Sequence, residues 1–532
     1  MDIIGPMKIF NFARAGHGLV ALALASGAPL AVADPVTWVA GDGAWENAAN
    51  WSGAALPGAT DFVTINHLGA VSSSANNNVA LEMVNRSALG ITAGKLAMGG
   101  TLDTFGAVTL GAAAKLDAGR VIIAGSGALN IGGDNSAVTI TQGLFNHGHW
   151  HMTGGVNSTL SAESFDNFDG VDIEGGANAS ANSMINQARV SITGAGSTLA
   201  VHGSVTNDGT VFLLAGGQLA SHSINNNGAL EVTSAALVSD SILNRGLGSR
   251  LQVHGAGANL TVSTTLTNAD TDGNSALEIS AGGNAQIASL INTASVLVDH
   301  GQLGGQDLDN QRGVVDVNHA TVEITGRLIN SARLNIDGSA SVHTGSFQQT
   351  AGLTHIAGGT LGASDDFGVQ VAGGEIRGHG TIDGRLVLSA NGLLAAGDSA
   401  DNSGRFDVAG ALDLLGGHFA VDLGGSAATD YDRIAVHGAA TLGGSLEVAL
   451  LDDFNPLLGD VFDIILADSI NGVFGNIALP TLGDGLKFIT VNGGTFFRLQ
   501  VAAVPLPAPI LLLGGAVALL GYHTRRRVTR GA

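Results

Sequence analysis

The chain has 532 residues, with 22 Lys and Arg against 44 Asp and Glu, and a formal net charge of −22. Such an acidic protein is not expected to bind nucleic acid, whose phosphates attract lysine and arginine. The absence of cysteine excludes disulfides and thiol chemistry, and 80 glycines with only 9 prolines and no Gly-X-Y period exclude collagen. A hydrophobic fraction of 45% argues against intrinsic disorder.

Residues 1–33 have the order of a secretory signal peptide. Lys8 and Arg14 supply positive charge, and residues 19–24 begin a short apolar core. The small residues Ala31 and Ala33 form a cleavage site. We therefore expect export through the Sec machinery, with an uncleaved N-terminal anchor as the alternative.

Residues 34–61 hold three of the four tryptophans, Trp38, Trp45 and Trp51. A solenoid needs caps, because an open terminal coil is an exposed sheet edge. We expect these rings to cover the first coil, and the alternative is an aromatic platform on which sugars stack. The stretch resembles the N-terminal part of exported bacterial β-helix proteins of the autotransporter-passenger type.

Residues 62–375 carry a repeat in which an asparagine follows an apolar residue and precedes an alternating strand. Nine steps cover the 184 residues from the first to the last of these asparagines, or about 20 residues a step. Strands of three to five residues, separated by Gly and Asn, indicate β-structure, and this period is typical of one coil of a parallel β-helix. The repeated residues are Asn146, Asn167, Asn186, Asn207, Asn226, Asn244, Asn268, Asn292, Asn310 and Asn330.

We accordingly predict an all-β fold, a right-handed parallel β-helix of roughly 15 coils at about 4.8 Å each. Stacked asparagines are expected to bond to one another along the axis. The rival fold is a string of β-sandwiches, which usually lacks a fixed 20-residue repeat.

Residues 376–503 are expected to form a β-rich C-terminal cap or stalk. The segment is rich in phenylalanine, and the order of its strands resembles the segment that closes the β-helical passengers of autotransporter-like proteins. It would separate the repeats from the last part of the chain.

Residues 504–532 read as a sorting signal with one transmembrane helix. An uncharged run over 510–522 is followed by the basic residues Arg525, Arg526 and Arg527, which the positive-inside rule keeps in the cytoplasm. A simple C-terminal anchor is the alternative interpretation. The run is preceded by a short proline-containing motif, Val504, Pro505, Leu506, Pro507 and Ala508.

The motif, the apolar run and the arginines resemble the PEP-CTERM class of sorting signals, in its Val-Pro-Leu-Pro-Ala variant. The resemblance implies transient insertion in the inner membrane and processing near the motif by an exosortase, a membrane cysteine peptidase. It also implies a Gram-negative host that makes exopolysaccharide, and hence a final place on the cell surface or in the extracellular matrix.

Many parallel β-helices degrade polysaccharides, so two groups of acidic residues are candidates for catalysis. The two groups are Asp166, Asp169 and Asp172, and the pair Asp365 and Asp366. Few basic residues accompany the repeats, and solvated acidic turns explain both groups. No catalytic residue or cofactor is predicted.

Two patterns are candidates for metal sites. His147, His149 and His151 alternate around a tryptophan, but no further ligand of another type can be named. Residues 268–274 imitate the start of a calcium loop, but Glu278 stands at the eleventh position and not at the twelfth. No metal site is predicted.

These observations predict an exported, non-enzymatic surface or matrix protein with a structural or adhesive role, associated with biofilm or exopolysaccharide. The alternatives are a polysaccharide-degrading β-helix enzyme and a permanently anchored adhesin that is not processed. Clustered acids with basic partners in one groove would favour the enzyme.

Overall fold

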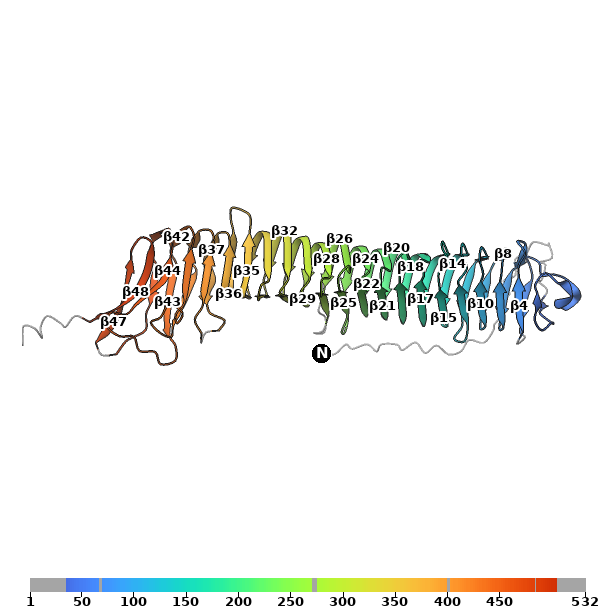
Figure 1. The fold of residues 1–532 in the computed structure, drawn as a ribbon, viewed down its shortest axis with the longest axis horizontal. Coiled ribbons are helices and arrows are strands. Elements are labelled where there is room, and N and C mark those ends of the chain that lie inside the picture. Colours follow the sequence, from blue (N-terminus) through green and yellow to red (C-terminus); the bar gives the residue numbers. More distant parts are fainter. Residues whose placement is uncertain (1–34, 67–68, 270–274, 400–401, 484, 505–532) are drawn as a thin grey trace, which may run out of the picture.

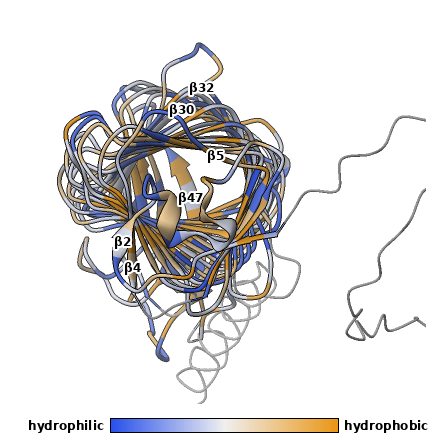
Figure 2. Cartoon of the chain, turned by 90° about the vertical axis from the view of Figure 1, so that its right-hand side faces the viewer, coloured by the Kyte–Doolittle hydropathy of each residue, from blue (hydrophilic) through white to orange (hydrophobic). Residues whose placement is uncertain are grey.

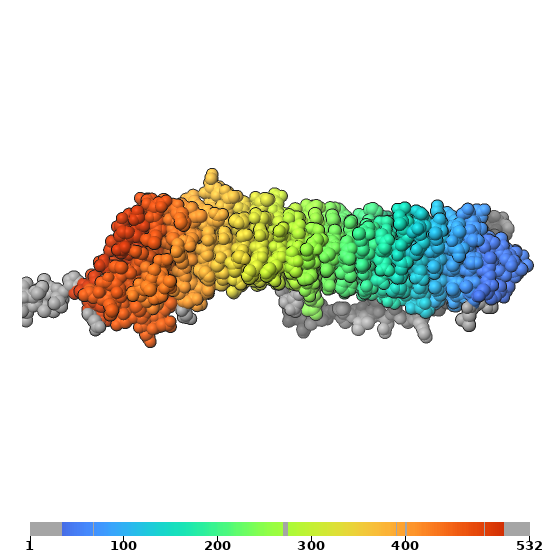
Figure 3. Space-filling view, viewed as in Figure 1, coloured from blue at the N-terminus to red at the C-terminus, as the bar shows by residue number. Residues whose placement is uncertain are grey.

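The computed structural model describes residues 35–66, 69–269, 275–399, 402–483 and 485–504. These residues form a long rod in which successive turns of the chain stack along one axis (Figures 1 and 3). The fold is an all-β parallel solenoid of about 16 turns, with coils of about 20 residues. The prediction of a parallel β-helix with this period is confirmed. The first strands, around β4 (blue), and the last strand, β48 (red), lie at opposite ends of the rod (Figure 1).

The N-terminal part contains short strands and two 3-10 turns. Its elements are β1 (Pro35–Thr37), β2 (Gly43–Ala44), η1 (Ala48–Asn50), η2 (Ser52–Ala54), β3 (Phe62–Ile65), β4 (Ala70–Ser73), β5 (Asn78–Ala80), β6 (Glu82–Asn85), β7 (Ala88–Ile91), β8 (Lys95–Met98), β9 (Thr101–Thr104), β10 (Ala107–Leu110), β11 (Lys115–Ala118), β12 (Arg120–Ile123) and β13 (Ala128–Ile131). Each of β1 to β4 pairs in parallel with a strand of the next coil, so the first coil already belongs to the ladder.

The central coils alternate one long strand with one short strand. The long strands are β14 (Ala137–Asn146), β16 (Thr159–Asn167), β18 (Asn178–Asn186), β20 (Thr198–Asn207), β22 (Gln218–Asn226), β24 (Ala236–Asn244), β26 (Asn259–Asn268), β28 (Asn284–Asn292), β30 (Gln302–Asn310), β32 (Thr321–Asn330) and β34 (Ser341–Gln349). The short strands are β15 (His149–Met152), β17 (Gly170–Glu174), β19 (Arg189–Thr193), β21 (Thr210–Leu214), β23 (Ala229–Thr233), β25 (Arg250–His254), β27 (Ala276–Ser280), β29 (Ser295–Asp299), β31 (Val314–Asn318) and β33 (Arg333–Asp337).

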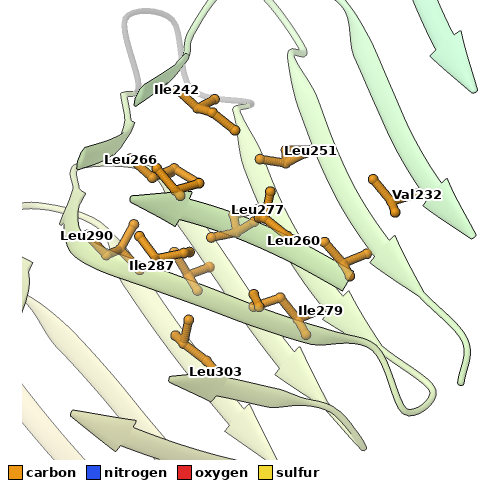
Figure 4. Close-up of a cluster of buried hydrophobic side chains, with 14 of the residues drawn as sticks. Val232, Ile242, Leu251, Leu260, Leu266, Leu277, Ile279, Ile287, Leu290 and Leu303 are labelled. Carbon is orange, nitrogen blue, oxygen red and sulfur yellow. The ribbon is translucent and has the colours of Figure 1, made fainter. Parts of the chain in front are cut away.

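The core lies inside the coils because side chains alternate along each strand. In β17, Val171 and Ile173 are buried while Asp172 between them faces outward. Seen along the axis, the coils superpose into one closed outline (Figure 2). Equivalent inward residues of neighbouring coils then stack, as Ile242, Leu266 and Leu290 do in Figure 4.

The predicted asparagine ladder is present and continuous from Asn146 to Asn330. Each Nδ2 donates to the Oδ1 of the next asparagine, 18 to 24 residues on, at 2.7–3.0 Å. All ten side chains are buried, so these bonds satisfy groups that water does not reach. At one end Asn330 donates to Thr354 Oγ1. At the other end Ile123 occupies the preceding position, and Asn146 Oδ1 is buried without a partner.

The C-terminal part is β-rich, as predicted. Its strands are β35 (Leu353–Ala363), β36 (Val369–Asp383), β37 (Leu386–Ala396), β38 (Arg405–Val408), β39 (Leu412–Leu414), β40 (His418–Leu423), β41 (Arg433–Val436), β42 (Ala439–Leu442), β43 (Ser445–Leu450), β44 (Val461–Leu466), β45 (Ser469–Gly472), β46 (Asn476–Ala478), β47 (Leu486–Asn492) and β48 (Phe496–Ala503).

The expected boundary between repeats and cap at 375/376 does not end the parallel ladder. Parallel pairing continues to β43 with β46. What changes is the coil length, since Arg405 pairs in register with Arg433, 28 residues on. Between the named strands of the described chain, antiparallel pairing begins only where β48 pairs with β44 and β47. This reversal covers the last sheet edge.

Candidate anion-binding pocket

A pocket of about 610 Å³ lies where the 20-residue coils give way to the longer C-terminal coils. Strand β36 contributes His379, β38 contributes Arg405 and Asp407, and β41 contributes Arg433. Asp398 follows β37 and completes the charged lining. The volume is within the roughly 300–1,000 Å³ of small-molecule sites in proteins.

The parallel ladder places two arginines side by side. Arg405 and Arg433 are register partners on β38 and β41, and the inward positions of both strands are taken by buried apolar residues such as Phe406 and Ile434. The alternation of the strands therefore turns both guanidinium groups outward, one coil apart. Two like charges so close favour an anion between them.

The two arginines differ in their partners. Arg405 Nη2 contacts Asp407 Oδ1 at 2.5 Å on the same strand. Within the part of the chain that the structure describes, Arg433 has no ion pair and no side-chain hydrogen bond, although it is only half-exposed. A guanidinium group presents a planar fork that matches a carboxylate, a sulfate or a phosphate.

Both carboxylates of the pocket are already engaged. Asp398 Oδ1 lies 3.0 Å from His379 Nδ1 and 3.3 Å from His355 Nε2, which comes from β35 in the preceding coil. The contact with His355 has an ion-pair distance but not hydrogen-bond geometry, because that nitrogen is buried without a hydrogen-bond partner. With Asp407 held by Arg405, neither pocket acid is left free to act as a general base.

A buried carboxyl group beneath the pocket connects two of its strands. Burial raises the pKa of Asp432 to about 8, against the lowering effect of two backbone N–H groups and of the Arg377 charge. These N–H groups belong to Gly404, at 2.8 Å, and to Asp422, at 3.0 Å. Asp432 thus ties the residue before Arg405 to the residue before Arg433. Arg377 pairs with Glu375, and its Nη1 is buried without a hydrogen-bond partner.

The predicted tryptophan site is a packed cluster. Trp38, Trp45 and Trp51 are 0%, 1% and 1% exposed, and their rings meet edge to face at 4.7–4.8 Å. The indole N–H of Trp51 donates to Trp45 O at 2.8 Å, and that of Trp38 to Gly41 O at 2.9 Å. Because no ring presents a face to solvent, the burial favours the cap interpretation over sugar stacking.

The predicted sorting residues fall almost entirely outside the described residues. Val504 is described, and its N–H donates to Gly485 O at 2.7 Å. The rest of the motif, Pro505 to Ala508, the arginines 525–527 and the cleavage residues Ala31 and Ala33 lie outside. Among the residues that are described, no helix is long and apolar enough to cross a membrane.

Of the three histidines around Trp150, His149 and His151 share the outer face of β15, whereas His147 precedes the strand and stacks on Phe168. His149 lies 3.5 Å from Asp172, and His151 lies 3.0 Å from Glu174, in the next coil. Each histidine therefore faces its own carboxylate. Arg189 also contacts Asp172, so this carboxylate is part of a surface ion-pair group.

Comparisons with known proteins do not assign these pocket residues to a family. No protein-family model matches the chain, and no curated protein sequence matches it. The pocket residues therefore have to be interpreted from their own chemistry.

Sequence reasoning missed the pocket because its residues come from coils of another length. Arg405 and Arg433 are 28 residues apart, whereas the repeat was read with a period of about 20. A signal was nevertheless present. Both arginines are followed by an apolar residue, a small or acidic residue and a valine, which is the outward–inward alternation of one repeated strand.

Proposed function

We propose that the chain is an exported, non-enzymatic surface or matrix protein with a structural and adhesive role, which holds an acidic exopolysaccharide through the pocket at Arg405 and Arg433. The observation that carries the proposal is the half-exposed Arg433, which has no side-chain partner in the described chain and lies beside a second arginine. A uronate, sulfate or phosphate group on a sugar would supply the missing anion.

The charge of the whole chain supports a local contact. At a net charge of −22, most of the rod repels a polyanion, whereas the pocket brings together two of the chain's 22 basic residues, of which Arg433 has no ion pair in the described part of the chain. A volume of about 610 Å³ holds a short stretch of sugar, so the polymer would be gripped at one end of the rod and not along its length.

The proposal includes the route and anchoring expected from the sequence. The signal peptide and the PEP-CTERM-like tail support export through Sec, brief retention by a C-terminal transmembrane helix and release by an exosortase. The winding of the solenoid is proposed to be right-handed, as in about 98% of connections between parallel strands.

The binding proposal is tested by titrating the exported protein with oligogalacturonate and with a neutral oligosaccharide of equal length, by calorimetry. We expect binding of the acidic sugar only. Arg433→Ala should weaken it about tenfold or more, because a hydrogen bond to a charged group is worth about 1.5–3 kcal/mol and about 1.4 kcal/mol is a factor of ten. Arg433→Lys keeps the positive charge but loses the planar guanidinium group. Its affinity should therefore lie between that of the unsubstituted protein and that of Arg433→Ala.

Arg245→Ala is the matched control, since Arg245 is an exposed arginine on a distant coil. An equal loss of affinity in Arg433→Ala and Arg245→Ala would show that only the overall charge of the protein matters, and not the pocket. Shortening of the oligosaccharide during the titration would favour the degrading enzyme, and Asp398 or Asp407 would then have to leave its present partner to act.

Localisation is tested by the mass of the C-terminal peptide of the mature protein from culture supernatant and from membranes. An end near Val504–Ala508 with the protein outside the cell supports processing. A chain that ends at Ala532 and stays in membranes supports the permanently anchored adhesin instead.

A further inference from the structure

Two histidines occupy one corner of the solenoid in neighbouring coils. His300 follows β29 and His319 follows β31, and the register pairs Asp299 with Asn318. The N–H of His300 donates to Asn318 O at 3.0 Å, which holds the two corners one coil apart. The spacing of the two imidazoles is thus set by the backbone ladder.

Both histidines have left-handed backbones, with φ of +52° and +48°. The equivalent residues of the flanking coils, Ala281 and Gly338, have φ of +53° and +59°. This corner therefore demands a left-handed residue but no particular side chain. Imidazoles stand at two consecutive positions where alanine or glycine would satisfy the backbone.

We propose that Asp299, His300 and His319 form a surface site for a divalent transition metal, with Zn²⁺ as the best fit. One ligand atom from each residue, two ring nitrogens and a carboxylate oxygen, lies within 4.8 Å of the other two. His300 Nδ1 is 2.8 Å from Asp299 Oδ1. Two imidazoles and a carboxylate match the three protein ligands of zinc sites that keep a fourth position for water.

The site needs a modest closure around the ion. The two rings are stacked, with centroids 5.0 Å apart and planes 10° from parallel, so one ring must tilt for both lone pairs to meet at one point. Tetrahedral zinc places its nitrogen ligands about 3.3 Å apart, given bonds of about 2.0–2.1 Å. Both imidazoles are exposed and can turn. The missing side chain at Gly338 leaves room, since a Cβ there would be 2.9 Å from His319 Nε2.

The donor set selects against hard cations. Calcium and magnesium prefer oxygen, whereas imidazole suits zinc, copper and nickel. The net charge of −22 raises the local concentration of any divalent cation but does not discriminate among them. Selectivity would therefore come from the two ring nitrogens.

His355 and His379 both approach Asp398 Oδ1, at 3.3 and 3.0 Å, but these three residues do not form a group whose ligand atoms are all close to one another. His222 pairs with Asp240 at 2.6 Å on an exposed face, and its group includes no second imidazole. Within the described ranges, the group of Asp299, His300 and His319 alone brings three such ligands within reach of one ion.

The test is calorimetric titration of the untagged exported protein with ZnCl₂, and with CoCl₂ followed by absorption spectroscopy. We expect one tight site with the visible spectrum of tetrahedral cobalt. His300→Ala and His319→Ala should each weaken binding about tenfold or more. Both variants should fold, because Ala281 adopts the same backbone at the equivalent corner.

His222→Ala is the control, because it removes an exposed histidine from a histidine–aspartate pair without touching the site. It should leave zinc affinity unchanged. Loss of affinity in His222→Ala equal to that in His319→Ala would show diffuse surface binding and overturn the proposal. So would the absence of a stoichiometric site, or a site whose affinity His319→Ala does not change. CaCl₂ should not compete for the site, and competition at equal concentration would contradict the ligand assignment.

Discussion

Replacement of Asn207 by alanine should destabilise the solenoid by about 2–4 kcal/mol, although the side chain touches no ligand. Asn207 Nδ2 donates to Asn226 Oδ1 at 2.7 Å and to Ala229 O at 2.9 Å, and its Oδ1 accepts from Asn186 Nδ2 at 2.7 Å. Alanine removes all three bonds from the middle of the ladder.

The expected loss of stability depends on which neighbouring asparagine loses a hydrogen-bond partner that nothing else replaces. Asn186 Nδ2 keeps Ala188 O at 3.0 Å and Thr210 O at 3.3 Å as acceptors, so its loss is small. Asn226 Oδ1 loses its donor and stays buried, which costs about 1–3 kcal/mol. The small cavity adds about 1 kcal/mol.

The assay pairs guanidinium unfolding with hydrogen exchange of peptides from the coils around Asn207. Exchange is needed because a solenoid is quasi-one-dimensional and a local loss need not spread over all coils. The control is Asn227→Ala, since Asn227 is only partly buried and its Nδ2 donates to Asp208 Oδ1 at 2.8 Å at the surface. We expect a change of about 0.5 kcal/mol or less there.

A second variant tests the direction of the bonds. Asn207→Asp keeps an acceptor for Asn186 but sets an oxygen against Asn226 Oδ1, so it should be at least as harmful at neutral pH. Acidification should restore part of the loss, because a protonated carboxyl group can donate again. Equal stability of Asn207→Ala and Asn227→Ala would refute the reasoning, and the ladder would then only fill space.

Three further predictions concern the tryptophan cap, the position before the asparagine ladder and the buried Asp432. Trp51→Ala should cost about 3–5 kcal/mol and expose the first coils to exchange, because this buried ring packs against both other cap tryptophans. Ile123→Asn should cost less than Val121→Asn in denaturant unfolding, since only position 123 offers a donor to the unpaired Asn146 Oδ1. Asp432, whose pKa is raised to about 8, keeps its proton in the folded state while the unfolded state loses it near pH 4, so stability should fall with pH between about 4 and 8, by at most about 1.4 kcal/mol per pH unit. Unfolding of Asp432→Asn across that range should lack this slope.

Local patterns made the repeat predictable from the sequence. Asn207 and Asn226 each follow an alternating strand and precede a glycine two residues on, so the period and the stacking could be read directly. The pocket could not be found in this way, because the approach of Arg405 to Arg433 depends on a coil length that changes after residue 375. The site at His300 and His319 could be predicted only in part. Its two residues are 19 positions apart, within the repeat, but only the structure gives their shared left-handed backbone.

Because the chain runs in one direction along the rod, the number of coils sets the distance between its two ends. The chain runs once from the N-terminal end (blue) to the antiparallel strand β48 (red), so these two ends are separated by the whole stack (Figure 1). About 16 turns at about 4.8 Å make roughly 75 Å. If a surface held the chain at Val504, the tryptophan cap would lie about that far from the surface. The pocket at Arg405 and Arg433 would lie near the surface. Gain or loss of one coil would change this reach in increments of about 4.8 Å and leave both ends as they are.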